Sequence, residues 1–512
     1  MEKKRLTGIN RRDFLKLAGG FSLVPLVEKP ESGKKWLSQS GQSLPNIIIL
    51  VLDALSARHL SLYGYHRKTS PNIDRFAEKA AVFHNHHSAA NFTTPSTASL
   101  LTGKYPWGHH AYTLRSTISG SSAQSNIFHY LHEKYHTAAF SQNLYADKLL
   151  FQFEQYLDRH LPADSFNFSG RTIYTRLPGN EAVAGFRAYD QFMLNRTPER
   201  GSLFLSLLHD FNYLLRYRLA FRDLGEMYPL GMPSVDGCYA NFTLEEVMDG
   251  VISLLDGLPT PFIAYLHLLP PHSPYRPSTG FRKVFNDGWE PPPTTVHPLG
   301  DVTQGDSPKK RQLYDEFIAN LDNEISRLLE YLQSTGLLEK SYFILTSDHG
   351  ELFERGELGH STPLLFEPLL HIPLVIASPG QKRRIDIRTP TSSIDLFPTL
   401  LAIAGVEVPT PTAGQVLPLG NREGDHSRDI WALEAKNNST FGPLKQATLA
   451  LYRGNSKLVY YHGYKNYKDQ FEFYDLDIDP DELENRYPAD PAAAEMQAKL
   501  EAQLNKIRHQ VR

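Results

Sequence analysis

Two short stretches of this sequence contain residue types that act as nucleophiles or metal ligands in enzymes. The run "TTPST" begins with Thr93, and the run "SDHG" places Asp348 beside His349. A threonine hydroxyl is a poor nucleophile until a base or a metal ion takes its proton. A carboxylate next to an imidazole suits Zn or Mn better than Ca, which prefers oxygen ligands. Together the two stretches raise the hypothesis of a threonine nucleophile that is activated by a metal ion.

Asp53 is a third candidate ligand, because it ends the apolar run "NIIILVLD". A metal ion held by Asp53, Asp348 and His349 next to Thr93 would activate that hydroxyl. Each of these residues also has a purely structural interpretation. The aspartates could cap the helices that follow their strands, His349 could lie at the surface, and Thr93 or Thr94 could cap a helix.

A proline in the first stretch indicates where its helix begins. Pro95 follows Thr94, and proline is favoured at the first position of a helix. Thr93 would then lie just before the helix N-terminus, where backbone N–H groups and the helix dipole favour an anion. That position suits a residue that attacks a negatively charged group.

The elements that would position these residues alternate between strands and helices. This alternation predicts an α/β fold, with a doubly wound, mostly parallel sheet flanked by helices. Ligands bind at the carboxyl ends of the strands in such sheets, where Asp53, Asp348 and His349 lie. A helix over "SPNIDRFAEKA" is expected to have Ser70 as its cap. Buried strands are expected in the runs "NIIILVLDALS", "AAVFHNHH", "HTAAFSQN", "PFIAYLHLLPP", "SYFILTSDHG" and "HIPLVIASPG".

Changes in composition divide the chain into four parts. Residues 1–30 are interpreted as an export signal or anchor, 31–45 as a polar linker and 46–405 as the catalytic α/β domain. Within that domain, about residues 145–258 are aromatic and helical in period, which predicts an insertion that covers or lines a site. Residues 406–512 are expected to form a smaller C-terminal subdomain with an antiparallel sheet and a final helix.

The bulk composition excludes some classes of function. The formal net charge is -3 over 512 residues, so no basic surface argues for nucleic acid. The single cysteine, Cys238, allows neither an internal disulfide nor a zinc cluster built from cysteines.

The N-terminus contains the paired arginines Arg11 and Arg12, followed by a short apolar run. This pattern resembles a bacterial twin-arginine export signal, which implies the Tat export machinery as a partner and a periplasmic or exported protein. The segment could be retained as a membrane anchor, because no clear cleavage site follows it. The alternative is a basic amphipathic N-terminus. No later run reads as a transmembrane helix.

The stretches "NIIILVLDALSARHLSLYGYHRKTSPNIDRFAEKAAVFHN" and "TTPSTASLLTGKYP" resemble the sulfatase family of the alkaline-phosphatase superfamily. The runs "LTSDHGELFERGELGH", "HIPLVIASPG", "SSIDLFPTLLAIAG" and "FYDLDIDPDELENRYP" continue the resemblance in the order of the family. It covers most of residues 46–487 outside the insertion. The resemblance implies the α/β fold of that family and a metal-dependent reaction on anionic esters.

Several positions depart from the pattern of family sulfatases. They have cysteine or serine, converted to formylglycine, where this chain has Thr93, which cannot form that group. They have arginine where this chain has Thr97, and a second acid where it has Ala54. Their lysine and histidine after the strand near residue 140 fall within "SQNL", with Gln142 and Leu144 nearest. Most cations that would bind a sulfate are therefore absent by this comparison, and His360 stands in place of a later lysine.

What remains is similar to the threonine-using branch, which includes lipoteichoic-acid synthases and phosphoethanolamine transferases. The resemblance implies that Asp53, Thr93, Asp348 and His349 hold one divalent metal ion, which could be Mn, Zn, Mg or Ca, with Mn or Zn favoured. His272, in "LPPHSPYRP", corresponds to a substrate-facing histidine of the family, and His360, in "LGHSTP", to a substrate-binding histidine of the transferases. Either imidazole could protonate the leaving oxygen.

Each of these two histidines could instead be a hydrogen-bonded structural residue. The cluster of His84, His86 and His87 is interpreted as a solvated strand end rather than a metal site, because no acid accompanies it.

The sequence thus predicts a hydrolase or phosphotransferase that forms a covalent intermediate on Thr93 and acts on a phosphodiester or a sulfate ester. The expected partner is an anionic ester, such as an envelope lipid headgroup or glycan. One alternative is a sulfatase that uses the unmodified Thr93. A second is an inactive relative that binds an envelope glycan or lipid headgroup.

Overall fold

The computed structural model of the chain describes residues 44–114, 116–163, 165–166, 202–235, 240–301, 307–420, 424–438 and 444–509. Residues 44–512 form one compact unit. The predicted export signal and nearly all of the predicted linker lie outside the described residues. Among the described helices, none is both long enough and apolar enough to cross a membrane.

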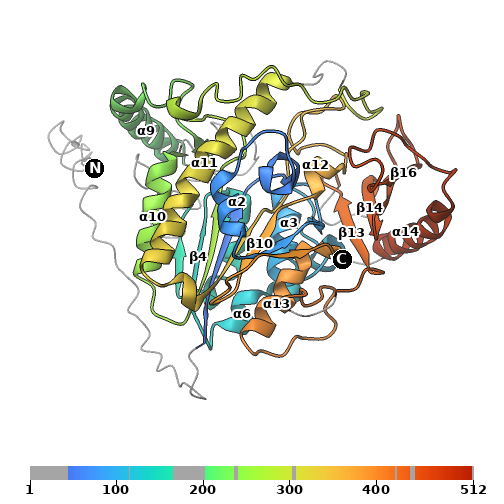
Figure 1. Cartoon of the computed structure of the whole chain (residues 1–512), viewed down its shortest axis with the longest axis horizontal. Coiled ribbons are helices and arrows are strands. Elements are labelled where there is room, and N and C mark those ends of the chain that lie inside the picture. The colour runs from blue at the N-terminus through green and yellow to red at the C-terminus, as the bar shows by residue number, and fades with distance from the viewer. Residues whose placement is uncertain are drawn as a thin grey trace, which may run out of the picture. The chain divides into compact units, whose positions relative to one another are not determined.

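An eight-stranded, mostly parallel sheet forms the centre of this unit (Figure 1). Its strand order is β11-β2-β10-β9-β1-β8-β4-β5, and β10 is the strand that runs antiparallel to both of its neighbours. The predicted fold class is therefore confirmed. The strands are β1 (Asn46–Leu52), β2 (Ala81–Phe83), β4 (His136–Ser141), β5 (Arg159–Leu161), β8 (Phe262–Leu268), β9 (Ser341–Thr346), β10 (Leu374–Ala377) and β11 (Ile385–Ile387).

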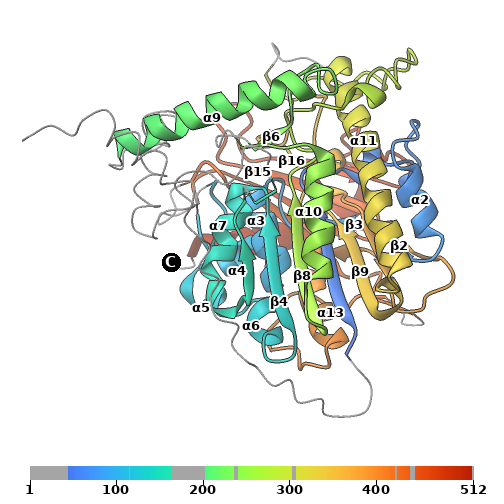
Figure 2. The ribbon, with the colours of Figure 1, turned by 90° about the vertical axis from the view of Figure 1, so that its left-hand side faces the viewer.

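The central strand β1 is buried on both faces, as its unbroken apolar run predicts. One face packs against α2 (Pro71–Ala77), α10 (Leu244–Asp256) and α11 (Pro308–Ser334). Figure 2 shows α10 and α11 in front of the sheet. The other face packs against α3 (Thr93–Thr102), α6 (Ile127–Leu131), α7 (Leu144–Gln152) and α13 (Leu396–Ile403). These two hydrophobic layers fix the positions of the strand ends.

The segment predicted as an insertion contributes to the main layers. β5 is the edge strand beside β4, and α10 packs against α11. The amphipathic spacing of α10 explains this packing, since Val247, Val251 and Leu255 point to the core. The segment also contains α9 (Leu203–Leu224), β6 (Ser234–Val235) and β7 (Ala240–Asn241).

A four-stranded antiparallel sheet with order β13-β14-β15-β16 forms the C-terminal part. The strands are β13 (Asp429–Glu434), β14 (Ala447–Arg453), β15 (Ser456–His462) and β16 (Gln470–Asp475). The last helix, α14 (Pro491–His509), packs on β14 and β15 through its apolar side (red in Figure 1). The shorter elements are β3 (His86–His87), which pairs with β12 (Thr391–Ser392), and α4 (Pro106–His109), α5 (Gly120–Ala123) and α12 (Glu367–Leu370).

One local expectation is wrong. The run "AAVFHNHH" forms two short strands, β2 and β3, that belong to different sheets. Ser70 is the N-cap residue of α2, as predicted, but its hydroxyl donates to Asp74 instead of accepting from the helix backbone. The first turn of α2 is capped from outside by Asp322 of α11, whose carboxylate accepts from the backbone N–H groups of Asn72 and Ile73, each at 2.9 Å. The cap is a long-range contact, so local sequence could not reveal it.

Candidate active site

Four neighbouring strands of the main sheet deliver polar residues to one place. The strands β9, β1, β8 and β4 are adjacent, and they are parallel to one another. Asp53 follows β1, and His267 is the last-but-one residue of β8. Asp348 lies two residues after β9, and Asn143 lies two residues after β4. Because the carboxyl ends of parallel strands meet at one edge, these side chains converge.

The ring of His349 faces two carboxylates. Its Nε2 lies 3.6 Å from Asp53 Oδ1 and 3.5 Å from Asp348 Oδ2. Both of these oxygens are buried, and neither has a hydrogen-bond partner among the described residues. The other ring nitrogen, Nδ1, lies 2.9 Å from the carbonyl oxygen of Gly350, so it carries the proton and donates it. The unprotonated Nε2 therefore points its lone pair at two partnerless carboxylate oxygens, an arrangement that a cation between them would stabilise.

His267 was not predicted as a site residue. Its Nε2 lies 3.2 Å from Asp53 Oδ2 and 3.8 Å from Asp348 Oδ2, and its Nδ1 lies 3.1 Å from the hydroxyl of Tyr265. Asp53, His267 and Asp348 each offer a ligand atom within 4.8 Å of the others, and all three are buried. The sequence carried a signal for this residue, since His267 is a polar interruption at the end of a buried apolar strand.

The electrostatics of the group reflect its burial and its charges. Burial, reinforced by the charge of Asp53, raises the pKa of the Asp348 carboxyl. Burial alone would also raise the pKa of Asp53, but the hydrogen bond with His267 and the nearby histidines lower it strongly. Burial lowers the pKa of His349, which keeps that ring neutral. Two buried carboxylates and a neutral imidazole form a donor set that fits a divalent cation such as Zn or Mn.

Thr93 lies beside this group. Its Oγ1 is 3.4 Å from His349 Nε2 and 3.1 Å from Asn143 Nδ2. Neither threonine caps the helix. The N-cap residue is Phe92, whose side chain makes no hydrogen bond to the helix. The hydroxyl of Thr94 donates to the carbonyl of Leu114. The structural alternative of a capping threonine is therefore wrong.

The start of α3 also differs from the prediction. The helix begins at Thr93, so this residue lies in the first turn rather than before it, and Pro95 occupies the third position rather than the first. Proline is tolerated throughout this turn, because the first N–H groups of a helix have no partner within the helix. The hydroxyl still lies at the positive end of the helix dipole.

Asn143 completes the surroundings of the threonine. Its Nδ2 donates to Asp53 Oδ2 at 2.5 Å and to Thr93 Oγ1 at 3.1 Å. Its Oδ1 accepts from the backbone N–H of Tyr145 and so caps α7. The sequence comparison placed Gln142 and Leu144 nearest to the lysine and histidine of family sulfatases, and Asn143 between them is the residue that contacts Asp53 and Thr93. Gln142 instead accepts a hydrogen bond from the backbone of Leu269.

The backbone around the two aspartates is held in restricted conformations. Ala54 has φ +60°, a left-handed conformation that is unfavourable for a residue with a Cβ. It is held there by its N–H, which donates to Asp348 Oδ1, and by its carbonyl, which accepts from the hydroxyl of Tyr314. A Cβ on Gly350 would lie 2.0 Å from the carbonyl oxygen of Pro368, so glycine is required there.

His272 and His360, the two candidate acids, are half-buried and lie close to His349. The ring centroid of His360 is 4.3 Å from that of His349 and 4.9 Å from that of His272. Nδ1 of His360 lies 2.9 Å from Glu351 Oε1, and the hydroxyl of Tyr275 donates to Glu351 Oε2 at 3.0 Å. Burial by itself would raise the pKa of Glu351, but the charges of His360 and its neighbours lower it. The carboxylate therefore fixes the orientation of the His360 ring.

The three histidines near β3 have separate partners. His84 contacts Asp386, His86 contacts Thr391, and His87 contacts Glu367. The expectation of a solvated strand end without acids is wrong, because His86 and His87 are buried and two carboxylates are present. Each partner stands on a different segment, so the three rings diverge.

Two protein-family models match this chain. The family model "Sulfatase" matches residues 45–406, and the model "N-sulphoglucosamine sulphohydrolase, C-terminal" matches residues 356–510. The chain belongs to the sulfatase family. Its resemblance to this family, inferred from the motifs, is confirmed.

Relatives of this sulfatase-family protein are ester-hydrolysing enzymes. A choline-sulfatase of Rhizobium meliloti (strain 1021) is 25% identical over 483 residues, which are 88% of this chain and 84% of the relative. The solved phosphonate monoester hydrolase of Agrobacterium radiobacter has a TM-score of 0.63 at 20% identity and covers 91% of this chain and 95% of its own. A structure solved with its substrate D-glucosamine-2-N,6-O-disulfate has a TM-score of 0.62 at 18% identity, with 90% and 97% covered. The chain is thus a sulfatase-family hydrolase of ester bonds, and the two solved structures establish its fold.

Proposed function

We propose that this sulfatase-family protein hydrolyses an anionic ester through a covalent intermediate on Thr93. The observation that carries the proposal is the position of Thr93 Oγ1, 3.4 Å from His349 Nε2 and at the start of α3. The Thr93 hydroxyl does not cap the helix, and it points toward a buried group of two carboxylates and an imidazole. A purely structural role does not require that convergence.

Asp53, Asp348 and His349 would hold one divalent cation, with His267 as a further ligand. A cation at this position supplies Lewis acidity, which lowers the pKa of a neighbouring hydroxyl and offsets negative charge. The amide of Asn143 orients Thr93 Oγ1 by donating to it. The backbone N–H groups of Thr93 and Thr94, at the start of α3, stabilise charge that develops on the ester oxygens.

The reaction balances over two steps. In the first, the Thr93 hydroxyl releases its proton to solvent, its oxygen bonds to phosphorus or sulfur, the bond to the leaving oxygen breaks, and His360 or His272 gives that oxygen a proton. In the second, water attacks the esterified Thr93 and gives one proton to the same histidine, the bond to the Thr93 oxygen breaks, and that oxygen takes a proton back from solvent. The net change is one water consumed for one ester bond cleaved.

Two substrate chemistries have separate support. The choline-sulfatase relative matches most of both chains, which favours a sulfate ester. Thr93 cannot form the formylglycine that the cysteine or serine of family sulfatases forms, and this favours a phosphodiester. The same nucleophile would serve both reactions, because each substrate is a monoanionic ester.

The test compares an aryl sulfate with an aryl phosphodiester, with Mn or Zn added, for the wild type and for Thr93→Ala. We expect turnover of one substrate, and a loss of about a thousandfold or more in kcat for Thr93→Ala. Thr93→Ser should keep measurable activity, because it retains the hydroxyl. Thr102→Ala, the same change at the other end of α3, is the matched control and should stay near wild type.

Several outcomes would distinguish catalysis through Thr93 from the alternatives. Full activity of a metallated Thr93→Ala protein would show that another group is the nucleophile. Mass spectrometry of the quenched wild-type reaction should find one added phosphoryl or sulfuryl group on the peptide that contains Thr93. A wild-type protein with neither turnover nor bound metal would favour an inactive binding relative.

We also propose that the N-terminal segment directs export through the twin-arginine pathway, as the pair Arg11 and Arg12 suggests. Replacing both residues by lysine should retain the protein in the cytoplasm of a bacterial host. Fractionation of the cells would measure this, and unchanged export would exclude the pathway.

A further inference from the structure

One face of helix α9 carries large apolar side chains that are exposed. This apolar stripe consists of Phe204, Leu207, Phe211, Leu214, Leu215 and Leu219, and each of these side chains is more than half exposed. Their spacing of three or four residues places them on the same side of the helix. Monomeric soluble proteins rarely expose a continuous apolar surface of this kind, so the stripe marks a site of interaction.

The apolar stripe has no part in the cores of the protein. None of its residues belongs to a hydrophobic core of the part of the chain that the structure describes. The next helix, α10, shows the opposite arrangement, because its apolar residues Val247, Val251 and Leu255 are buried. Packing within the described residues therefore does not explain why α9 has an apolar face.

Two arginines continue the stripe toward the C-terminal end of α9. Arg218 and Arg222 follow Leu214 at successive intervals of four residues, and both are exposed. The formal net charge of the chain is -3, so positive charge beside the stripe does not simply reflect the composition. A row of apolar residues that continues into arginines fits a surface that offers both acyl chains and phosphate groups.

The segment after α9 connects this helix to the loop that carries His272. The backbone N–H of Thr279 donates to the carbonyl of Met227 at 2.7 Å, and Arg276 Nη1 donates to the carbonyl of Met232 at 2.6 Å. Figure 2 shows α9 crossing the top of the molecule, with its N-terminal end projecting past α7. A surface that binds α9 would therefore lie on the side of the molecule where the loop after β8 stands.

A second copy of the chain fits the stripe less well than a lipid surface does. In a two-fold dimer with antiparallel α9 helices, Arg218 and Arg222 would lie against the apolar residues of the other copy. With parallel helices they would lie against the same two arginines. Both arrangements bury positive charge without a carboxylate on the stripe to pair with it. At a bilayer, the guanidinium groups reach lipid phosphates while the stems of the side chains stay among apolar groups.

We propose that α9 docks this protein on the surface of a lipid bilayer that contains anionic phospholipids. The helix would lie in the plane of the interface, because none of the described helices is both long enough and apolar enough to cross a membrane. The apolar stripe would enter the boundary between headgroups and acyl chains, and Arg218 and Arg222 would contact phosphates. Docking would turn the loop that carries His272 toward the bilayer. The proposal goes beyond the proposed function and does not depend on it, since docking needs no turnover.

The first test measures sedimentation of the full-length protein with vesicles. The vesicles contain phosphatidylcholine alone, or phosphatidylcholine with about one third phosphatidylglycerol. The parent protein carries Phe14→Glu and Leu15→Glu, so that the apolar run at the N-terminus does not bind the vesicles itself. We expect the parent to bind the anionic vesicles. Adding Leu207→Gln and Phe211→Gln should weaken this binding by about tenfold or more, because two apolar side chains no longer leave water.

Ile478→Gln with Leu483→Gln is the matched control. These two side chains are 69% and 52% exposed, against 69% for Phe211 and 55% for Leu207, and they follow β16 in the chain. Their replacement should change vesicle binding by less than about twofold, because they lie outside α9. No binding by the parent protein, or equal losses in the two double variants, would overturn the proposal.

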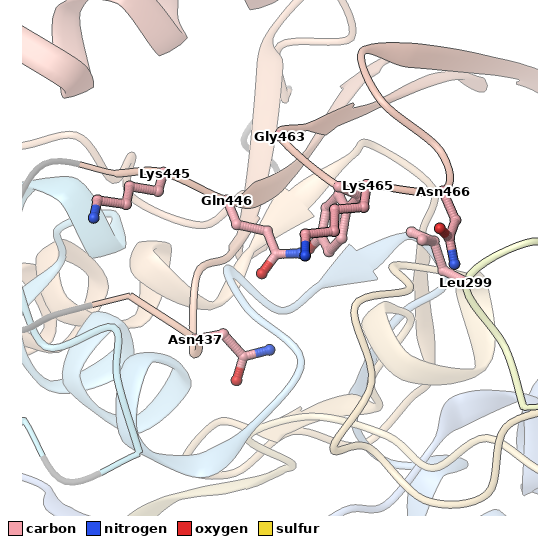
Figure 3. Close-up of a pocket in the computed structure, with 8 residues that line it drawn as sticks. Leu299, Asn437, Lys445, Gln446, Gly463, Lys465 and Asn466 are labelled. Atoms are coloured by element: carbon pink, nitrogen blue, oxygen red, sulfur yellow. The ribbon is translucent and has the colours of Figure 1, made fainter.

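The two arginines have a test of their own. Arg218→Gln with Arg222→Gln should weaken binding to the anionic vesicles by about tenfold and leave binding to phosphatidylcholine unchanged. The control is Lys445→Gln with Lys465→Gln, which removes two exposed positive charges from the lining of a hollow in the C-terminal part (Figure 3). Equal losses in both double variants would assign the binding to overall charge and overturn the role of α9.

A fluorophore on α9 reports insertion directly. The full-length protein with Leu215→Cys and Cys238→Ser would be labelled at position 215 with a dye whose emission depends on polarity. We expect a blue shift with the anionic vesicles, and an unchanged spectrum would overturn the proposal. A parent protein that is dimeric, binds no vesicles and becomes monomeric with Leu207→Gln and Phe211→Gln would assign the stripe to a second copy instead.

Discussion

The side-chain amide of Asn143 donates to Thr93 Oγ1 at 3.1 Å and, through the same nitrogen, to Asp53 Oδ2 at 2.5 Å. One residue thus links the proposed nucleophile to a proposed metal ligand. Because Asn143 also caps α7 through its Oδ1, its side chain is fixed from both ends. Its amide holds the hydroxyl without taking its proton, which suits a positioning residue.

We therefore expect Asn143→Ala to lower kcat by about 10- to 100-fold, since the Thr93 hydroxyl loses its fixed orientation. Metal content should stay near wild type, because the amide nitrogen is not a ligand. Steady-state kinetics together with metal analysis measure both quantities. If kcat were unchanged, the contact between Asn143 and Thr93 would have no role in the reaction.

Removal of the metal should destabilise the protein. Without a cation, Asp53 and Asp348 leave two buried carboxylate oxygens without partners, which costs free energy. We expect chelation to lower the melting temperature, and Mn or Zn to restore it in a concentration-dependent way. The double variant Asp53→Asn, Asp348→Asn should lose this dependence. A melting temperature that changes neither with the chelator nor with added metal would contradict the metal site.

His267 provides a separate test of the ligand set. Its Nε2 lies close to both aspartates, so His267→Gln should weaken metal affinity by about 10- to 100-fold. His84→Gln is the control, because the ring of His84 contacts Asp386. Asp386 lies on another strand, β11, and is not one of the candidate metal ligands. Calorimetric titration with Zn would measure the affinities. Equal affinities of both variants would exclude His267 as a ligand.

Glu351 should act through His360. The carboxylate fixes the His360 ring by contact with Nδ1 at 2.9 Å, so Glu351→Gln should reduce kcat by about tenfold or more with little change in KM. Tyr275→Phe, which removes the other hydrogen bond of Glu351, should have a smaller effect in the same direction. A rise in KM with unchanged kcat would assign Glu351 to substrate binding.

The contact between Asp322 and α2 predicts a stability effect outside the site. Asp322→Ala leaves the N–H groups of Asn72 and Ile73 without their acceptor, so we expect a loss of about 1–3 kcal/mol in the free energy of unfolding. Ser326→Ala, on the exposed side of α11, should change it by less than about 0.5 kcal/mol. Urea unfolding measures the free energy of unfolding of both variants. Equal losses in the two variants would contradict the capping role of Asp322.

The positions of Asp53, Thr93, Asp348 and His349 show how much of the candidate site can be predicted from sequence. Each lies at the end of an apolar strand or at the start of a helix, and these local patterns are readable without the fold. Asn143 and His267 were missed for different reasons. Asn143 follows a strand whose end appeared to offer Gln142 and Leu144, and His267 lies within a strand that reads as core.

Local patterns in the sequence are enough to predict the fold class, the order of the strands along the chain and the residues at the ends of β1 and β9. These follow from short-range periodicity and from the few residue types that end a buried strand. The folded structure sets which strand ends are neighbours, because the order β9-β1-β8-β4 is not the order of the sequence. It also brought Lys436 beside Phe92 and Asp322 to the end of α2. Such contacts arise from the packing of whole layers, which no local pattern encodes.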